Sequence, residues 1–596
     1  MALLSVLLLI CVTATYYTFS HAKPVISQPK STCSFSTQLW EGGEDVFGHA
    51  AGGACRYTVR YGQAARWVDS QLSFDVGNRT SSLPPSCPQP AGTYVVGSEQ
   101  SEDCLYATIY SPKGMSPLSK LPIFVWIHGG SFYAGSASAP GLDGSKLAST
   151  GDIIVIVIQY RLGVLGYIPP STAPSWADPN LGLRDIILGL QTINQYAALI
   201  GGDPNKVTVG GQSSGGSMIR ALLGAPTAKS LFRAAIVQSD PMNYGFASPD
   251  ITSQLRRAFY SQDQMKQCDS LKCLQQIPVA TIVAAQNYLV ASTPLTIQGV
   301  PLTMPIRPSY NNPTLTSDPT VDLFNIPTSL SNDPSSIALL LSTVSNEAGS
   351  ALQATFPAPV PLSNDTYFAS LSMIVNPDRA KTISSAAQYA LPSVNSSSEA
   401  GVYGQGGDMF RETYERAATD GIWRCPNRDV ARAWSRAGGK VWVGEWTKGA
   451  TYPTNQQSGG YCKQKGRVCH EDDIYPTFGS APNPSADMTS FEDEILSYWT
   501  SFIKDLDPDG PSSSGPKRNY PNLTHLIDKA KNWWDDWSSS WKWWKRAAST
   551  DPPAAVTTWD QYRDDDDVLA LGGGEVSMCL EGFWGDTAKY DWQLYG

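Results

Sequence analysis

Short, unbroken runs of apolar residues most constrain what this chain can fold into. Residues 123–127 and 153–158 are such runs, and residues 207–209 form a shorter one. A strand that is apolar on both faces must be covered on both faces, so these runs predict a parallel sheet between layers of helices. Residues 181–199 have apolar positions at helical spacing and end before Gly201-Gly202-Asp203-Pro204. This alternation predicts an α/β fold.

Length and composition bound the class of protein. The chain has 596 residues, 42% of them hydrophobic, which is enough for a large core. Its net charge of −10 argues against binding to the polyanionic backbone of a nucleic acid. No apolar run reaches the roughly 18 residues that a membrane-spanning helix needs. We therefore expect a soluble protein with no nucleic-acid partner and no transmembrane segment, and its oligomeric state is left open.

The first 22 residues have the features of a secretory signal peptide. Residues 3–12 are apolar, and Ser20-His21-Ala22 offers a cleavage site with small residues at the required positions. The basic residues that usually precede the apolar part are missing. The alternative is a buried N-terminal helix, which Pro24 argues against. We expect residues 1–22 to be removed and the remaining chain, residues 23–596, to form one large domain.

The cysteines agree with export. One of the eleven, Cys11, lies in the predicted signal, and an even number remains, which favours disulfides over free thiols in a secreted chain. None of them has the C-x₂-C spacing of a structural zinc site, so we expect no metal. Four N-x-[ST] sequons would accept glycans on the secretory route: Asn78, Asn364, Asn395 and Asn522.

An insertion is predicted at about residues 508–552. Its first part is rich in Pro, Ser and Gly, and six tryptophans follow within residues 533–544. Three interpretations remain open. The tryptophans form a platform that stacks on sugars or lies on lipid, they belong to a surface helix that packs on the main domain, or the segment is under little selection.

Residues 211–215 read Gly-Gln-Ser-Ser-Gly, the one G-x-S-x-G motif in the chain. Small residues beside the serine permit a sharp turn from strand to helix, which exposes the serine Oγ at the start of the helix. The motif alone is a weak signal. However, residues 207–209 predict the strand before it, and the apolar residues from Met218 onward predict the helix after it. This context makes Ser213 the candidate nucleophile.

A serine nucleophile needs a base, and the chain has only five histidines. Four of them lie in the signal, upstream of the serine or in the predicted insertion: His21, His49, His128 and His525. The fifth, His470, lies downstream of Ser213, as the chain order Ser…Asp/Glu…His requires. A lone histidine is ordinarily a surface residue, but elimination and chain order make His470 the candidate base.

The third member of such a triad is a carboxylate that holds the histidine tautomer. Residues 337–344 predict a buried strand, and Glu347 lies on the loop that leaves it. A carboxylate in this place is suitable, but many other Asp and Glu residues lie between Ser213 and His470. The residues alone therefore leave this assignment open.

A second glycine-containing loop precedes the serine. Residues 128–132 read His-Gly-Gly-Ser-Phe and follow the predicted strand at 123–127. Negative charge on the oxygen of a tetrahedral intermediate is stabilised by backbone N–H groups, and glycines let the backbone come close to a ligand. This loop is the candidate oxyanion hole, with a further N–H from Ser214.

Together these motifs resemble the type-B carboxylesterase/lipase family, which includes the cholinesterases and secreted fungal esterases. The resemblance extends over residues 87–480, about two thirds of the chain. Besides the serine motif, it is carried by residues 101–106 (Ser-Glu-Asp-Cys-Leu-Tyr), 126–132 (Trp-Ile-His-Gly-Gly-Ser-Phe), 160–163 (Tyr-Arg-Leu-Gly), 180–185 (Asn-Leu-Gly-Leu-Arg-Asp), 201–204 (Gly-Gly-Asp-Pro), 346–349 (Asn-Glu-Ala-Gly), and His470 with Asp473-Ile474.

The resemblance implies an α/β-hydrolase fold, in which a mostly parallel central sheet is flanked by helices in a single large catalytic domain. It implies a triad of Ser213 as nucleophile, Glu347 as orienting acid and His470 as general base. It also implies an oxyanion hole formed by the N–H groups of Gly130, Ser131 and Ser214. Ser131 replaces the third glycine of the family loop, and Ser214 replaces the usual alanine. Both retain a backbone N–H, while the added hydroxyls could change the fit of a substrate.

Two disulfides also follow from the resemblance, Cys87–Cys104 and Cys268–Cys273. The other six cysteines allow 15 pairings, among which Cys33–Cys55 and Cys462–Cys469 are local. Cys425 and Cys579 complete the set. In fungal lipases of the family the first disulfide loop carries a long lid, but here only residues 88–103 separate the cysteines. So short a loop favours an esterase without a large lid.

We therefore predict a secreted carboxylic ester hydrolase that acts on a small-molecule or lipid ester and needs no cofactor or metal. The alternatives within this class are a lipase and an esterase of carbohydrate-attached feruloyl or acetyl groups. The alternative outside it is a non-catalytic binding or adhesion protein, because the family contains such members. They typically lose the serine or the histidine, and this chain has both.

Overall fold

The computed structural model describes residues 33–36, 45–75, 82–95, 99–325, 336–392, 402–404, 407–456, 460–510, 558–563, 567–579 and 582–595. The predicted signal peptide and the tryptophan-rich segment lie outside these residues. So do three of the four sequon asparagines, Asn78, Asn395 and Asn522.

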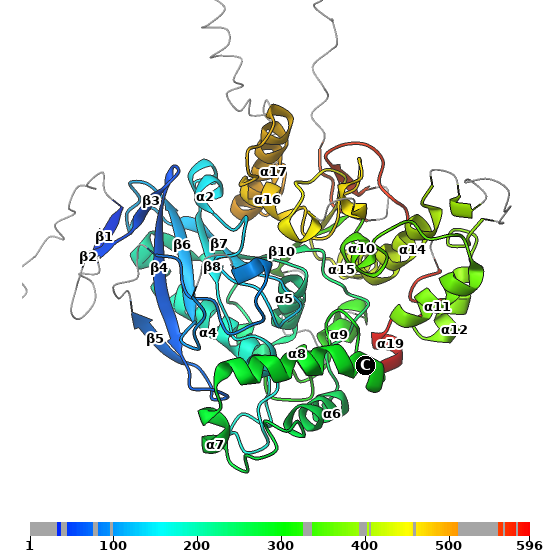
Figure 1. Ribbon diagram of the computed structural model, residues 1–596. Coiled ribbons are helices and arrows are strands. Elements are labelled where there is room, and N and C mark those ends of the chain that lie inside the picture. Colours follow the sequence, from blue (N-terminus) through cyan, green and yellow to red (C-terminus); the bar gives the residue numbers. More distant parts are fainter. Residues whose placement is uncertain are drawn as a thin grey trace, which may run out of the picture.

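An 11-stranded sheet is the centre of the described structure (Figure 1). The order of its strands is β13-β12-β11-β10-β9-β7-β8-β6-β4-β3, and β5 pairs with β4. A separate two-stranded sheet is formed by β1 (Ser34–Ser36) and β2 (Asp45–Phe47). The strands of the large sheet are β3 (His49–Ala51), β4 (Ala54–Gln63), β5 (Gln71–Asp75), β6 (Tyr106–Pro112), β7 (Leu121–Ile127), β8 (Ile154–Ile158), β9 (Gly202–Gln212), β10 (Ala234–Gln238), β11 (Ala338–Val344), β12 (Val441–Trp446) and β13 (Leu569–Leu571).

The sheet is mostly parallel. Every neighbouring pair from β8 through β7, β9, β10, β11 and β12 to β13 is parallel. Strands β6, β4, β3 and β5 pair antiparallel at the other end. The predicted mostly parallel sheet is confirmed, and the apolar runs at 123–127 and 153–158 lie in β7 and β8.

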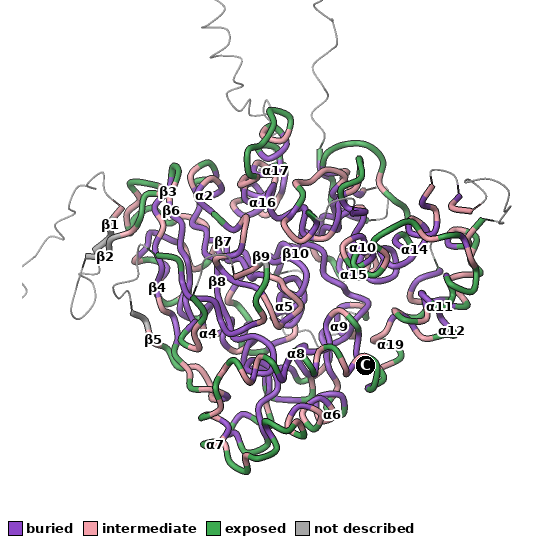
Figure 2. The backbone as a smooth tube through the Cα atoms, in the orientation of Figure 1, coloured by how far each residue is buried: buried purple, intermediate pink, exposed green. Residues whose placement is uncertain are grey.

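The apolar runs serve two cores because successive side chains of a strand point to opposite faces. In β8, Ile154, Ile156 and Ile158 belong to one buried cluster, while Val155 and Val157 belong to a second cluster on the other face. Figure 2 shows the central strands β7 and β8 buried along almost their whole length between the helical layers. A strand without polar alternation is therefore the expected result of covering both faces.

Helices cover both faces of the sheet. Residues of α4 and α5 pack into the first cluster, and residues of α2 and α17 into the second. The helices are α2 (Ser145–Gly151), α3 (Gly163–Tyr167), α4 (Leu181–Tyr196), α5 (Ser214–Gly224), α6 (Pro249–Tyr260), α7 (Leu271–Gln276), α8 (Val279–Thr296), α9 (Pro319–Asn325), α10 (Gly349–Thr355), α11 (Asn364–Ile374), α12 (Pro377–Ser385), α14 (Met409–Thr419), α15 (Cys425–Arg436), α16 (Ile474–Phe478), α17 (Ala486–Asp505) and α19 (Trp592–Tyr595). A π-helical turn, η5 (Asp420–Arg424), joins α14 to α15.

Five disulfides link the described cysteines: Cys33–Cys55, Cys87–Cys104, Cys268–Cys273, Cys425–Cys579 and Cys462–Cys469. Four of them join cysteines close in sequence. The fifth, Cys425–Cys579, joins the start of α15 to the C-terminal part of the chain across 154 positions.

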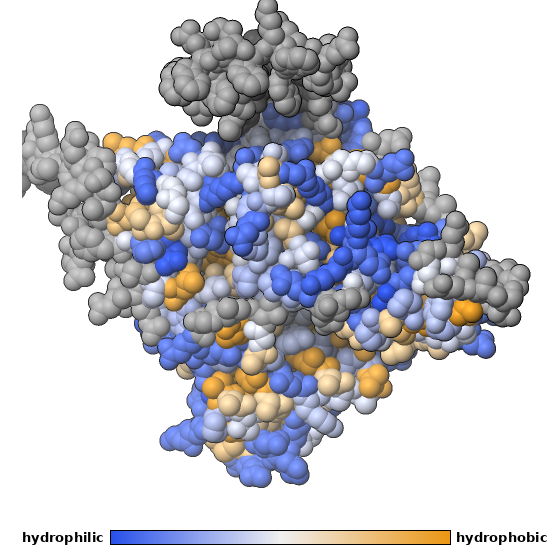
Figure 3. Space-filling view, turned by 45° about the horizontal axis from the view of Figure 1, so that its top comes forward, coloured by the Kyte–Doolittle hydropathy of each residue, from blue (hydrophilic) through white to orange (hydrophobic). Residues whose placement is uncertain are grey.

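The visible surface mixes polar and apolar residues. In Figure 3 hydrophobic residues gather in small patches in the lower half of the view, among hydrophilic ones. Individual apolar side chains are well exposed, for example Tyr288 and Leu295 of α8. Across the described ranges, no helix combines the length and the apolar character that a membrane crossing requires.

Candidate active site

The candidate residues lie where parallel strands end. β7 ends at Ile127, directly before the His128 loop, and β9 ends at Gln212, directly before Ser213. β11 ends at Val344, three residues before Glu347. Because the carboxyl ends of parallel strands share one edge of a sheet, three segments that are distant in sequence meet there.

Ser213 occupies a strained turn between β9 and α5. Its backbone has φ 58° and ψ −127°, a conformation that non-glycine residues adopt only where their surroundings enforce it. Its N–H donates to the carbonyl of Gln238 at 2.9 Å. A Cβ on Gly215 would lie 2.1 Å from the carbonyl oxygen of Ile127, so the turn packs against β7 only with glycine there. The small residues of the motif thus permit the predicted strand–turn–helix.

Glu347 and His470 are in direct contact. The Glu347 Oε2 accepts a hydrogen bond from the His470 Nδ1 at 2.6 Å, and its Oε1 accepts from the N–H of Val344 at 2.9 Å. The Glu347 side chain is fully buried, whereas that of His470 retains 16% of its exposure. The structure therefore brings together the two residues that are 123 positions apart in the sequence.

The second ring nitrogen of His470 faces the serine turn. The Gln212 Nε2 lies 3.2 Å from the His470 Nε2 and can donate to it only if that nitrogen carries a lone pair. A neutral ring that donates its Nδ1 hydrogen to Glu347 carries its lone pair on Nε2, which is the tautomer that a general base requires. Gln212 is the residue immediately before Ser213.

The surroundings of His470 favour its charged form. Burial alone lowers the pKa of the imidazole, but the hydrogen bond and charge of Glu347, with the charges of Glu471 and Asp473, raise the pKa above its usual value overall. For His128 the balance is opposite, because burial lowers its pKa to about 4. The His128 ring stacks on Tyr160, and its Nδ1 lies 3.0 Å from the carbonyl oxygen of Gly129. His128 is thus a neutral part of the glycine loop.

Two N–H groups of the 128–132 loop and the first N–H of α5 are unpaired among the described residues. Within the described ranges no hydrogen-bond acceptor is found for the N–H groups of Gly130, Ser131 or Ser214. By contrast, the N–H of Phe132 donates to the Ser214 Oγ at 3.3 Å. Ser214 is buried, whereas Gly130 and Ser131 are partly exposed. Buried N–H groups are nearly always paired, so the unpaired N–H of Ser214, next to the candidate nucleophile, is suited to a ligand oxygen.

A dense polar network holds the segment that carries His470. Asp472 accepts from the N–H groups of Cys469 and Tyr452, and the amide of Asn455 donates to both Asp472 and the carbonyl of His470. Burial raises the pKa of Asp472 to about 7. The network fixes the backbone on either side of the imidazole.

Glu471 and Asp473 hold the same segment through other parts of the chain. Glu471 has a left-handed backbone, φ 77°, and accepts from Tyr94 and Thr454, each at 2.5 Å. Asp473 accepts from the Gln238 side chain at 2.7 Å, and burial raises its pKa to about 7. Since the Gln238 carbonyl also accepts from Ser213, one residue at the end of β10 holds both the serine turn and the histidine segment.

Sequence reasoning missed several of these contributors. Gln212 and Asp473 belong to recognised motifs but carried no predicted role, whereas Glu471 and Asn455 gave no local signal. Trp423, in the π-helical turn η5, places its ring 5.7 Å from that of His470. π-helical turns occur frequently at functional sites, but their residues give no sequence signature. Only the position of Gln212 inside the G-x-S-x-G motif could have pointed to it.

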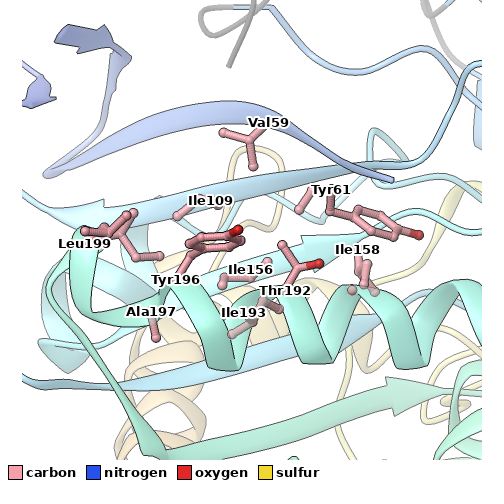
Figure 4. Close-up of a pocket in the computed structure, with 13 residues that line it drawn as sticks. Val59, Tyr61, Ile109, Ile156, Ile158, Thr192, Ile193, Tyr196, Ala197 and Leu199 are labelled. Carbon is pink, nitrogen blue, oxygen red and sulfur yellow. The ribbon is translucent and has the colours of Figure 1, made fainter. Parts of the chain in front are cut away.

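A separate apolar cavity contains none of the predicted site residues. It has a volume of about 30 Å³ and lies between α4 and strands β4, β6 and β8 (Figure 4). Its lining is aliphatic apart from Tyr61, Tyr196 and Thr192, so it has no group that could act as nucleophile or base at neutral pH. Among the described residues, no cluster of three or more His, Cys, Asp or Glu side chains is arranged to hold a metal ion.

The sheet, its helices and the groups at its carboxyl edge define the class as an α/β hydrolase. A sequence model of the carboxylesterase family matches residues 59–535, and the chain belongs to this family. The resemblance seen in the sequence motifs is thereby confirmed.

Similar proteins are esterases. The chain is 45% identical over 157 residues to para-nitrobenzyl esterase of Bacillus subtilis (strain 168), which is 26% of this chain and 32% of that protein. It is 35% identical over 232 residues to human carboxylesterase 3, 37% of this chain and 40% of that protein. The matches thus span about a third of the length of these relatives. A solved structure of PNB esterase superposes with a TM-score of 0.62 at 25% identity, over 82% of this chain and 93% of that one.

Proposed function

We propose that this protein is a carboxylic ester hydrolase in which Ser213 is the nucleophile, His470 the general base and Glu347 the residue that orients the histidine. The contact between the Glu347 Oε2 and the His470 Nδ1, at 2.6 Å, carries the proposal. The other ring nitrogen, Nε2, lies 3.2 Å from the side chain of Gln212, the residue before Ser213, and in the neutral ring this nitrogen carries the lone pair. Membership of the carboxylesterase family supports the same reaction class.

The reaction follows from these groups. The Ser213 Oγ attacks the ester carbonyl carbon while its proton moves to the His470 Nε2. The N–H groups of Gly130, Ser131 and Ser214 stabilise the negative oxygen of the tetrahedral intermediate. His470 then returns the proton to the leaving alcohol as the C–O bond breaks. A water molecule attacks the acyl-enzyme in the same way and releases the acid.

We also propose that the protein is secreted and that residues 23–596 form one catalytic domain. Five disulfides support an oxidising compartment. Asn364 is exposed at the first residue of α11, where a glycan would meet solvent. Mass spectrometry of the mature secreted protein would test the cleavage after residue 22 and the glycan on Asn364.

The substrate is proposed to be a small, soluble ester. The Cys87–Cys104 loop has only 16 residues between its cysteines, and Tyr94 in this loop is held by Glu471. A loop so short and so anchored favours an open esterase over a lipase activated at an oil–water interface. A jump in rate when the substrate exceeds its solubility would contradict this proposal.

Hydrolysis of p-nitrophenyl esters from acetate to palmitate, with Ser213→Ala as the blank, tests the proposed function. We expect activity that is highest on short acyl chains and absent from the variant. Activity highest on long chains would instead indicate a lipase. No hydrolysis of any ester by the wild-type protein would contradict the assignment.

A further inference from the structure

We propose that Ser214 is a positioning residue of the oxyanion hole and that it acts through its hydroxyl. It accepts the N–H of Phe132 and thereby holds the 128–132 loop against the first turn of α5, beside the nucleophile. The inference rests on the proposed ester hydrolase function and assigns a role to a side chain where the family motif has alanine.

The contact is direct and shielded from water. The Phe132 nitrogen lies 3.3 Å from the Ser214 Oγ, and both residues are almost completely buried. Water therefore cannot replace the hydroxyl as the partner of this N–H, and an alanine at position 214 would leave the N–H unpaired. The bond links two segments that are 82 positions apart in the sequence.

The loop needs such an anchor because its backbone is strained. Ser131 and Phe132 are consecutive non-glycine residues with left-handed conformations, φ 55° and φ 65°. L-residues rarely adopt this conformation, and it persists only where other contacts enforce it. In the family motif the first of the two positions is glycine, for which a positive φ has little cost. The serine at position 131 thus increases the strain that the anchor must overcome.

Phe132 is the point at which the loop is fixed. Its carbonyl accepts from the N–H of Gly163 at 2.7 Å, and its ring packs edge-on against Tyr167 with 5.8 Å between ring centroids. Those contacts join the loop to α3. The bond to Ser214 is the hydrogen bond that joins Phe132 to the helix behind the nucleophile. The side chain and the backbone of Ser214 thus both contribute to the oxyanion hole, because its hydroxyl holds the loop and its N–H remains free for the oxyanion.

The test compares Ser214→Ala with the wild-type protein on p-nitrophenyl acetate. We expect kcat to fall about tenfold, which corresponds to about 1.4 kcal/mol, while KM stays within about twofold. The affinity for a trifluoromethyl ketone, whose adduct with Ser213 carries the same oxyanion, should fall by a similar factor, since the loss concerns the transition state. Ser214→Thr retains a hydroxyl and should restore most of kcat.

Ser217→Ala is the matched control. Ser217 is a buried serine one turn later in α5, and its hydroxyl donates to Asp240 rather than to the loop. The Ser217→Ala variant should have a kcat and a ketone affinity within about twofold of those of the wild-type protein. The double variant Ser131→Gly/Ser214→Ala should lose less than Ser214→Ala alone, because glycine removes part of the strain that the anchor opposes.

The outcomes separate the inference from the proposed function. If the wild-type protein hydrolyses the ester and Ser214→Ala retains both kcat and ketone affinity, the positioning role is wrong. Equal losses of kcat and ketone affinity in Ser214→Ala and Ser217→Ala would show a general packing effect and would also overturn the positioning role. If Ser214→Ala does not fold, the folded Ser131→Gly/Ser214→Ala variant is compared with Ser131→Gly alone, and equal kcat values for these two variants would contradict the inference. A wild-type protein without esterase activity would overturn the proposed function and, with it, this role.

Discussion

The two sides of the candidate active site are built by different means. The serine side comprises the loop at residues 128–132 and the turn at 211–215, which follow the adjacent parallel strands β7 and β9. Its geometry lies in the backbone, with left-handed residues at Ser131, Phe132 and Ser213. The histidine side comprises Glu347 and residues 469–473. Its geometry depends on buried side chains that come from several parts of the chain.

Contacts across the histidine side illustrate this dependence. The N–H of Asn346 donates to the carbonyl of Val468, and the N–H of Ala348 donates to Thr419. The Cys462–Cys469 disulfide ends one residue before His470. A side built by neighbouring strands tolerates the loss of distant residues, whereas one built from scattered side chains depends on each of them. Four predictions test this difference.

The largest effect is expected on the serine side, for Ser213→Ala. If Ser213 is the nucleophile, its removal should lower kcat by roughly 10⁶-fold, as it does in the serine protease subtilisin, while the stability to heat remains close to that of the wild type. The measurement is the initial rate on p-nitrophenyl acetate together with a thermal unfolding curve. Residual activity within about tenfold of the wild type would show that another residue is the nucleophile.

The second-largest effect is expected on the histidine side, for Glu347→Gln. The amide has the same shape but lacks the charge that stabilises the imidazolium and holds its tautomer, so kcat should fall about 10⁴-fold. The Glu347 carboxylate also raises the pKa of His470, so the residual activity should reach its plateau at lower pH than in the wild type. An unchanged rate would mean that a different carboxylate orients His470.

The pH dependence of the wild-type enzyme should reflect the same pair. The base must be neutral, so kcat/KM should rise about tenfold per pH unit below the pKa of His470 and then level off. Since that pKa is raised, the midpoint should lie above 6.5. The raised pKa also means that His470 contributes stability below about pH 6.5 and loses it as pH rises through the folded-state value. A rate that is flat between pH 5 and 8 would exclude His470 as the base.

The smallest effect is expected from the disulfides. Replacing Cys462 and Cys469 with alanine opens a loop with a sequence separation of 7, and a loop of this size should cost about 2–3 kcal/mol of stability. Activity should fall as well, because the segment that carries His470 loses its brace. The matched control is the pair Cys268 and Cys273, with a separation of 5, which joins the loop after α6 to α7. Removal of the control disulfide should leave kcat unchanged. Equal losses of kcat in both variants would show that the Cys462–Cys469 disulfide has no specific role in holding the His470 segment.

The difference between the serine side and the histidine side also explains which features the sequence could predict. The apolar runs locate β7 and β8 within two residues, and the serine motif with its flanking strand and helix follows from local rules. His470 could be selected because so few histidines exist, but Glu347 required the family resemblance, since many carboxylates lie in the interval. β9 begins at Gly202, five residues before the apolar run that predicts it, because pairing with β7 extends it.

The remaining features could not be predicted, because they arise from tertiary contacts. A buried Glu471 with φ 77° has no local signal, since its hydrogen bonds to Tyr94 and Thr454 determine its conformation. Trp423 lies beside His470 in η5, a π-helical turn between two α-helices that has no sequence signature. Cysteine spacing favoured the local pairs but did not select Cys425–Cys579, whose partners are brought together by the completed fold.

The Cys425–Cys579 disulfide has a further consequence for the integrity of the molecule. Its two ends enclose residues 511–557, and β13, which follows that segment, pairs with β12 ahead of it. A protease that cut anywhere between residues 511 and 557 would therefore produce two polypeptides still joined by a covalent bond and by a shared sheet. Such a nicked protein would migrate as one species without reductant and as two fragments with it, and it would retain every residue of the proposed triad.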